Sequence, residues 1–429
     1  TMFFERFFTL QPFIWGEHTY KIYPLDFLII ISCALAALHI VFQKIKLPSW
    51  SRVDALVLLF IAIVTGFFLV QYLSEWGEAA LVVSAVKNYA FYVLLYFLVI
   101  IFADSRDAWK NVVTAFCVGG VLLLFFIVAG LIRGEGYWTA YTPLSTSGRR
   151  FLASTHAYYL TIPLILLFTR LVVEKVNHQF ETGLLLLVQL FGIFGSLMRH
   201  IWIALVLGLG FIFLTIPHHA KHLFRRYVQT GVIIGALVLI LFLLVMVALP
   251  FSKIATVLPD VTKPFTERIT SIFSGSNDVS AGWRLDVWRA TWDSFIRHPL
   301  VGIGFGQNMT FGRENYLLTV DIREIHNSPF AILVQMGLLG FIPFVLLIFF
   351  IFRSWWSAYR TMKDDDRFWV LGIGVSALVF LVASLFQPYL ETNTTAIFFW
   401  ILLGLMRTST YKSSNDKIQS PNQAQNPNV

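Results

Sequence analysis

The fold is decided by long apolar stretches such as residues 328–352, which read SPFAILVQMGLLGFIPFVLLIFFIF and contain no charged side chain. A helix of about 20 mostly apolar residues crosses the hydrocarbon core of a bilayer. Further stretches of this kind lie near residues 24–42, 53–72, 81–103, 111–132, 151–172, 182–198, 200–216, 229–249, 368–386 and 394–406. The segment 7–15 is apolar but short, so it is either a first helix or an interfacial segment. The sequence therefore predicts an all-α polytopic membrane protein with about twelve transmembrane helices.

The composition excludes a soluble protein. Of the 429 residues, 57% are hydrophobic and 13% are charged, whereas about 25% of the residues of a soluble domain are charged. The net charge of +8 comes largely from short loops between apolar stretches, so we expect membrane lipids and no nucleic acid as partners. Cys33 and Cys117 lie inside apolar stretches and are expected to be packing residues.

Basic residues in alternate connections predict the topology, because cytoplasmic loops of membrane proteins are enriched in lysine and arginine. The connections in question hold Lys44, Lys46 and Arg52; Arg106 and Lys110; Lys175; Lys221, Arg225 and Arg226; and Arg353, Arg360, Lys363 and Arg367. We therefore expect four parts. They are an N-terminal transmembrane bundle (1–249), a large periplasmic loop (250–327), C-terminal transmembrane helices (328–406) and a disordered cytoplasmic tail (407–429).

Within the large loop, residues 282–298 have the pattern of a helix that lies on the membrane surface. Trp283, Trp288, Trp292 and Phe295 recur at near-helical spacing beside arginines. Arg284 and Arg289 lie on this helix and could face phosphate or merely contact lipid head groups.

Arg199 has the most unusual position among the charged residues. It lies in the short connection 196–200 between two apolar stretches, either as an interfacial anchor or as a clamp for an anion. A guanidinium binds phosphate through two hydrogen bonds and stays charged at any physiological pH. Arg150, which precedes another apolar stretch, could add positive charge to the same site or simply flank a helix.

His326 ends the large loop immediately before the stretch at 328–352. Its imidazole could accept a proton near neutral pH, although a lone histidine is more often structural. Asn327 or Ser328 could cap the following helix. Glu391 could orient a base or bind sugar hydroxyls, or could be a solvated loop acid. No metal-ligand spacing is convincing, so we expect no metal site and no cofactor.

Three stretches resemble the O-antigen ligase and polymerase superfamily of bacterial envelope enzymes. They are residues 195–199 (GSLMR), residues 282–304 (GWRLDVWR leading to HPLVGIG) and residues 326–340 (HNS leading to GLLG). The first departs from the commonest pattern at Met198, where a small polar residue often precedes the arginine. Their order and spacing, more than any single motif, carry the resemblance.

The resemblance implies a glycosyltransferase type C-like fold and a metal-independent, inverting transferase in the bacterial inner membrane, with its active site facing the periplasm. The donor would be an O-antigen polysaccharide on undecaprenyl pyrophosphate, and the acceptor a sugar hydroxyl of lipid A-core. By the same resemblance, Arg199 and Arg284 would bind the pyrophosphate and His326 would be the general base.

Other functions are compatible with the same residues. An O-antigen polymerase or a protein O-oligosaccharyltransferase would use the same donor with another acceptor. A transporter of lipid-linked glycans would use the arginines as a path rather than as a reaction site. The single large outer loop favours the ligase.

Overall fold

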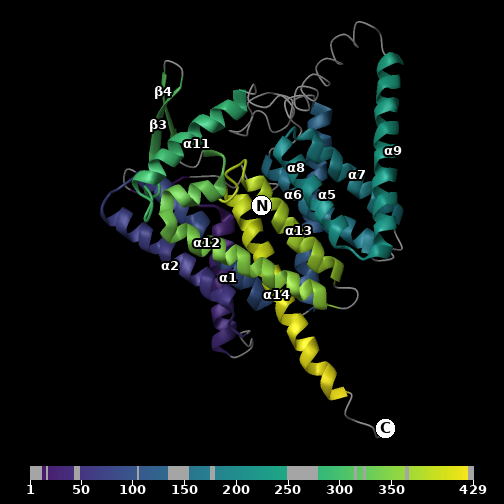
Figure 1. The fold of residues 1–429 in the computed structure, drawn as a ribbon, viewed down its shortest axis with the longest axis horizontal. Coiled ribbons are helices and arrows are strands. Elements are labelled where there is room, and N and C mark those ends of the chain that lie inside the picture. Colours follow the sequence, from purple (N-terminus) through teal and green to yellow (C-terminus); the bar gives the residue numbers. More distant parts are fainter. Residues whose placement is uncertain are drawn as a thin grey trace. The chain divides into compact units, whose positions relative to one another are not determined.

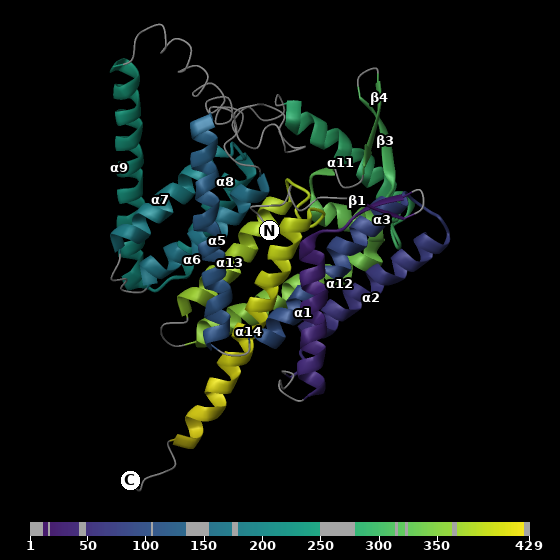
Figure 2. The same ribbon diagram turned by 180° about the vertical axis from the view of Figure 1, so that it is seen from behind.

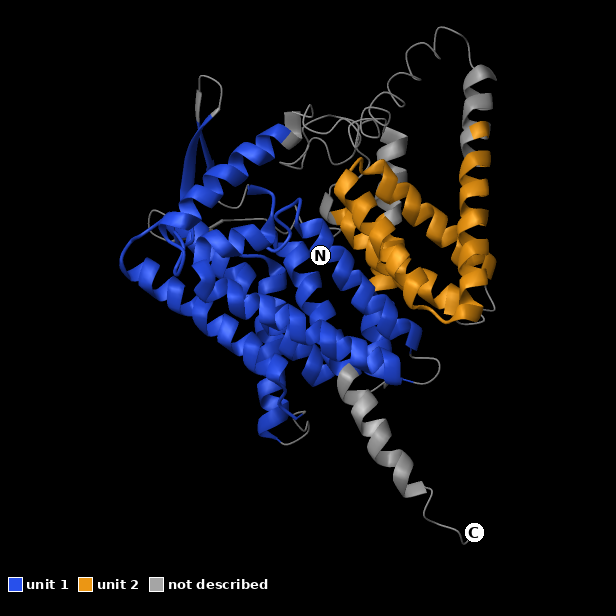
Figure 3. Ribbon diagram, in the orientation of Figure 1, with its two compact units in different colours: residues 1–115, 282–429 blue, residues 116–281 orange. Residues whose placement is uncertain are grey.

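The computed structural model describes residues 12–15, 18–42, 49–103, 106–133, 154–173, 179–248, 279–313, 316–321, 325–362 and 367–423. These residues are mostly helical (Figure 1). They divide into two compact units, residues 1–115 with 282–429 and residues 116–281 (Figure 3). The first unit therefore joins the two ends of the chain, whereas we expected divisions that follow the sequence.

Unit 1 is built around helices from both ends of the chain. Its N-terminal helices are α1 (Pro24–Val41), α2 (Arg52–Leu73), α3 (Ala79–Val86), the π-helical segment η1 (Lys87–Phe91) and α4 (Leu94–Phe102). Its C-terminal part holds α11 (Val279–Arg297), which begins just before the unit, α12 (Ser328–Thr361), α13 (Arg367–Ser384) and α14 (Asn393–Gln423). Helix α14 packs along α4 and α12, and α12 packs along α2 (Figure 2).

Unit 2 contains α6 (Ser154–Val173), α7 (Gln179–Gly195), α8 (Arg199–Thr215) and α9 (His218–Ala248). Helix α5 (Arg106–Arg133) begins in unit 1 and continues into unit 2. Helix α6 contacts α7, α8 and α9, so it lies at the centre of this unit.

The apolar stretches found in the sequence coincide with helices, which confirms a mostly helical, multi-pass membrane protein. Among the described residues, six helical segments are long and apolar enough to cross a membrane, and α7 and α8 are apolar but shorter. The described residues therefore do not confirm the expected number of about twelve transmembrane helices.

Two β-hairpins were not expected. Strands β1 (Pro12–Trp15) and β2 (His18–Lys21) pair antiparallel, so residues 12–15 do not form the possible first helix. Strands β3 (Asn308–Arg313) and β4 (Tyr316–Asp321) form the second hairpin. Its apolar residues alternate along the strands, and Met309, Phe311 and Val320 pack with Val287 of α11. The alternation is typical of a half-buried strand.

Helix α12 is broken at Gly337, whose φ is 58° and ψ is −159°. In an unbroken helix the amides of Leu338 and Leu339 would pair with the carbonyls of Val334 and Gln335. Here residues 299–304 form hydrogen bonds with all four groups. Leu338 and Leu339 donate to the carbonyls of Pro299 and Leu300, at 2.9 and 3.0 Å. Ile303 and Gly304 donate to Val334 and Gln335, at 2.9 and 3.0 Å.

Gln71 of α2 fixes the end of this segment. Its side chain accepts from the Phe305 amide at 2.8 Å and donates to the Phe305 carbonyl at 3.3 Å. At Gly304, with φ of +88°, an added Cβ would lie 2.0 Å from the Gln71 amide nitrogen. Residues 299–305 are therefore held between α12 and α2.

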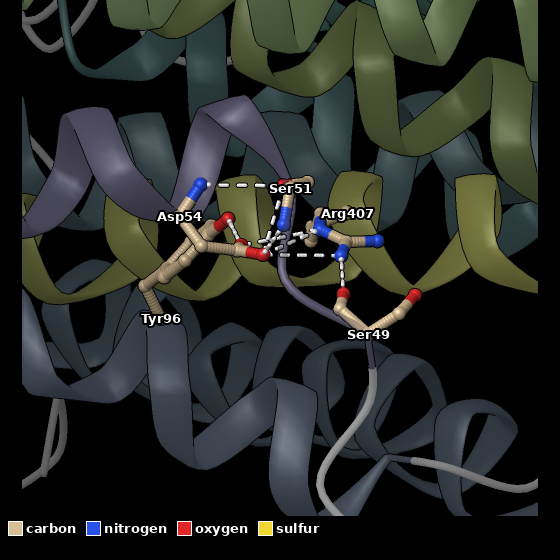
Figure 4. A network of polar contacts seen from close by, with 5 residues as sticks. All are labelled: Ser49, Ser51, Asp54, Tyr96 and Arg407. Atoms are coloured by element: carbon tan, nitrogen blue, oxygen red, sulfur yellow. Dashed lines mark hydrogen bonds and ion pairs between the residues drawn. The ribbon is translucent and has the colours of Figure 1, made fainter.

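A buried ion pair joins α14 to the start of α2 (Figure 4). The Arg407 Nε and Nη2 atoms each lie 3.1 Å from an oxygen of Asp54, and Nη2 also donates to the Ser49 carbonyl at 2.8 Å. The Tyr96 hydroxyl donates to Asp54 at 2.6 Å. Helix α14 extends beyond this ion pair to Gln423, whereas we expected a disordered tail over residues 407–429.

Replacing Arg407 with methionine should destabilise the protein by about 3–5 kcal/mol, because it leaves a buried carboxylate without its charged partner. Thermal unfolding in detergent measures the change. Arg360→Met, at an exposed position of α12, is the matched control and should unfold near the wild-type temperature. The double variant Asp54→Asn, Arg407→Met should recover much of the loss. Equal midpoints for Arg407→Met and Arg360→Met would contradict this role.

Gly337→Ala should also lower the unfolding temperature. The backbone conformation at Gly337 is nearly restricted to glycine and costs other residues about 1–3 kcal/mol, and the added Cβ would lie 2.4 Å from the Leu300 carbonyl group. Gly66→Ala in α2 meets no atom within 4 Å and should be neutral or slightly stabilising. A Gly337→Ala protein as stable as Gly66→Ala would refute the requirement for the break.

Candidate active site

His326 lies where the long loop meets α12, and its backbone is fixed on both sides. Its φ is +54°, which is uncommon for a residue other than glycine. On one side, Trp288 of α11 donates to the Ile325 carbonyl at 2.8 Å, and Ile325 is fully buried. On the other side, Asn327 caps α12 by accepting from the Phe330 amide at 3.0 Å. The expected cap by Asn327 is therefore confirmed.

The imidazole of His326 is half-buried between an aromatic ring and an amide. The Trp283 ring lies edge-on to it with centroids 5.3 Å apart. Its Nδ1 atom lies 3.0 Å from Oε1 of Gln387. Burial and the positive charge of Arg284 lower the pKa of His326, and the hydrogen bond to Gln387 partly opposes them. The ring is therefore neutral at neutral pH.

Arg284 follows Trp283 on α11 and is half-buried. Its charge acts on His326, so the structure brings these two sequence-predicted residues into one site. The core beneath them consists of residues from α11, the β3–β4 hairpin and the start of α12, including Val287, Ile325 and Val334. A guanidinium beside a neutral imidazole can bind an anion while the imidazole accepts a proton.

Glu391 is not a solvated loop acid, because only 8% of its surface is exposed. Its carboxylate accepts hydrogen bonds from the hydroxyls of Tyr89 and Ser328. Asn88 donates to its main-chain carbonyl at 2.7 Å. Glu391 thus joins η1 to the first residue of α12, two residues after His326.

Arg199 is the first residue of α8 and is half-buried within unit 2. The preceding connection is tight, with Leu197 at φ +57°. Ser196 is fully buried, donates to the Ile193 carbonyl at 2.6 Å and accepts from the Met198 amide at 3.3 Å. The local hydrogen bonding before Arg199 is therefore supplied by Ser196, and Met198 packs as an apolar residue.

The remaining predicted residues contribute less to this geometry. Arg289 is exposed and lies 3.9 Å from Asp286 on the same helix. Arg150 lies outside the described residues. In the part of the chain that the structure describes, no group of three histidine, cysteine or acidic side chains gathers as metal ligands.

Sequence reasoning missed the contacts of His326. Gln387 follows an apolar stretch and precedes Pro388, and nothing in its neighbours along the chain points to His326, which is 61 positions away. In the sequence, Trp283 reads as one of several interfacial aromatic residues.

Comparison of the sequence with known proteins finds a similar family. No curated protein matches the sequence. Residues 184–345 match the family described as O-antigen ligase, and this segment includes Arg199, Arg284 and His326 but neither Gln387 nor Glu391. The match covers 162 of the 429 residues, so it shows that this segment is similar to that family, and the apolar helices indicate a multi-pass membrane protein.

Proposed function

We propose that the protein transfers an O-antigen polysaccharide from undecaprenyl pyrophosphate to a sugar hydroxyl of lipid A-core, on the periplasmic face of the bacterial inner membrane. The observation that carries the proposal is the position of His326 at the start of α12, where Trp283 and Gln387 hold its imidazole and the charge of Arg284 acts on it, within the segment that matches the O-antigen ligase family.

In the proposed reaction, His326 takes the proton of the acceptor hydroxyl while that oxygen attacks the anomeric carbon of the donor. The bond between the anomeric carbon and the phosphate oxygen breaks, and undecaprenyl pyrophosphate leaves with the electron pair. This single displacement inverts the anomeric carbon. The pyrophosphate bond already activates the sugar, so the reaction requires no nucleotide.

The leaving group gains negative charge as the bond breaks, and Arg199 and Arg284 are proposed to bind it. Guanidinium groups stay charged and match the geometry of phosphate oxygens. They can therefore stabilise the departing pyrophosphate in the role that a divalent cation has in many transferases. The proposed mechanism is accordingly metal-independent.

The test is transfer by the purified protein. Undecaprenyl-pyrophosphate O-antigen and lipid A-core are incubated with it in detergent, without ATP and with excess EDTA, and the products are separated by gel electrophoresis. Formation of long-chain lipopolysaccharide supports the proposal. Longer lipid-linked glycan without lipopolysaccharide would assign a polymerase. Activity lost with EDTA and restored by one divalent ion would overturn the metal-free mechanism.

Arg199→Ala and Arg284→Ala should each reduce transfer about 100- to 1000-fold, the effect of removing about 2.7–4 kcal/mol of charge stabilisation. The lysine variants should recover only part of the rate, because an ammonium group cannot donate as a planar fork. Arg297→Ala, at the exposed end of α11, is the matched control and should keep wild-type turnover. Near-normal turnover of either test variant would remove that arginine from the site.

His326→Ala and His326→Gln should both abolish transfer and leave donor binding intact, because a positioned base contributes about 100- to 10,000-fold. In the wild type the neutral imidazole is the active form. Because its pKa is lowered below 6.5, the rate should be constant around pH 7 and fall only as the pH drops below that value. His222→Ala, exposed on α9, is the control.

Full turnover of His326→Ala at saturating donor would show that His326 is not the base. A protein that still moves lipid-linked glycan across vesicles after this change, without forming product, would instead be a transporter.

A further inference from the structure

We propose that Gln387 is a positioning residue that selects the tautomer of His326, holding the proton on Nδ1 so that Nε2 presents the lone pair to the acceptor hydroxyl. The inference rests on the proposed function. An amide oxygen accepts hydrogen bonds and cannot donate them. In the orientation of the amide that places Oε1 of Gln387 3.0 Å from Nδ1, the neutral ring donates from Nδ1.

The loop that carries Gln387 is tied to the helix start that carries His326. This loop joins α13 to α14. The hydroxyl of Ser328, which is fully buried, accepts from the Leu390 amide at 3.1 Å and shares its one proton between the Glu391 carboxylate and the Gln387 carbonyl, which lies 3.3 Å away. The backbone of Gln387 is therefore held by a residue only two positions after His326.

A second anchor comes from η1 at the N-terminal end of the chain. Asn88 and Tyr89 both donate to Glu391, one to its main-chain carbonyl and one to its carboxylate. Segments of π-helix are rare and often lie at functional sites. Here the segment presents two consecutive side chains to one residue of the loop. The loop is thus fixed from two elements, and neither contact uses the Gln387 side chain.

The choice of an amide has an electrostatic consequence. Gln387 and Trp283 contact the imidazole, and the positive charge of Arg284 acts on it. A carboxylate at position 387 would fix the same tautomer, but its charge would raise the pKa of His326 and would attract Arg284. The neutral amide orients the ring and leaves the guanidinium available for an anion.

Solid-state nitrogen NMR of the full-length protein with 15N-labelled histidine tests the tautomer directly, with the His326 signals assigned by their loss in His326→Ala. At pH 8 the wild type should show a protonated Nδ1 and an unprotonated Nε2. Gln387→Met should show both tautomers, with kcat reduced about 100-fold, within the range that a positioned base supplies, and with donor KM unchanged. Gln179→Met, at the exposed first residue of α7, should match the wild type in every measurement.

Gln387→Glu separates positioning from a structural role. It should keep Nδ1 protonated and move the acidic limb of the pH–rate profile upward by about one unit or more. A wild-type protein protonated on Nε2, or a Gln387→Met protein with unchanged tautomer and kcat, would overturn the inference. If the tautomer is as expected but His326→Ala retains its activity, the proposed base fails while the tautomer assignment stands.

Discussion

The structure depends on satisfying backbone hydrogen bonds where α12 is broken. An unpaired amide or carbonyl costs several kcal/mol in an apolar environment, so a long apolar helix cannot simply stop and restart. At Gly337 the two helical bonds that are lost are replaced by four bonds to residues 299–304. These four backbone hydrogen bonds hold residues 299–304 against α12.

The candidate active site follows from that exchange. Residues 299–304 come directly after α11, which carries Arg284, and the upper part of α12 begins two residues after His326. Fixing the segment against Val334 to Leu339 therefore ties the helix that carries Arg284 to the helix that begins after His326. Gln71 then secures the far end of the segment against α2. The break in α12 thus frees the backbone groups that bind residues 299–304, which an unbroken helix would keep paired internally.

The sequence predicted the helices well because apolar length alone determines them. The resemblance of their motifs also implied one site for Arg284 and His326; the charge of Arg284 does act on His326, and the roles of the two residues stay predictions. The sequence did not predict the contacts between distant parts of the chain. Gly337 reads as part of a family motif with no sign of a helix break, Glu391 reads as a polar residue of a loop, and Arg407 reads as the start of a polar tail. Each obtains its role from a partner more than 30 residues away, Leu300, Tyr89 and Asp54 respectively.

In the proposed reaction, the charge of Arg284 near His326 would couple donor binding to the strength of the base. Burial and the charge of Arg284 both hold the pKa of His326 low. In the proposed reaction the pyrophosphate would neutralise that charge, and the imidazole would become a stronger base only when donor is present. Without donor, the neutral ring is a weak base and does little to activate water or a stray hydroxyl. Arg284 would then have two roles. It would stabilise the leaving group, and its neutralisation by bound donor would raise the basicity of His326, so donor binding would precede activation of the acceptor.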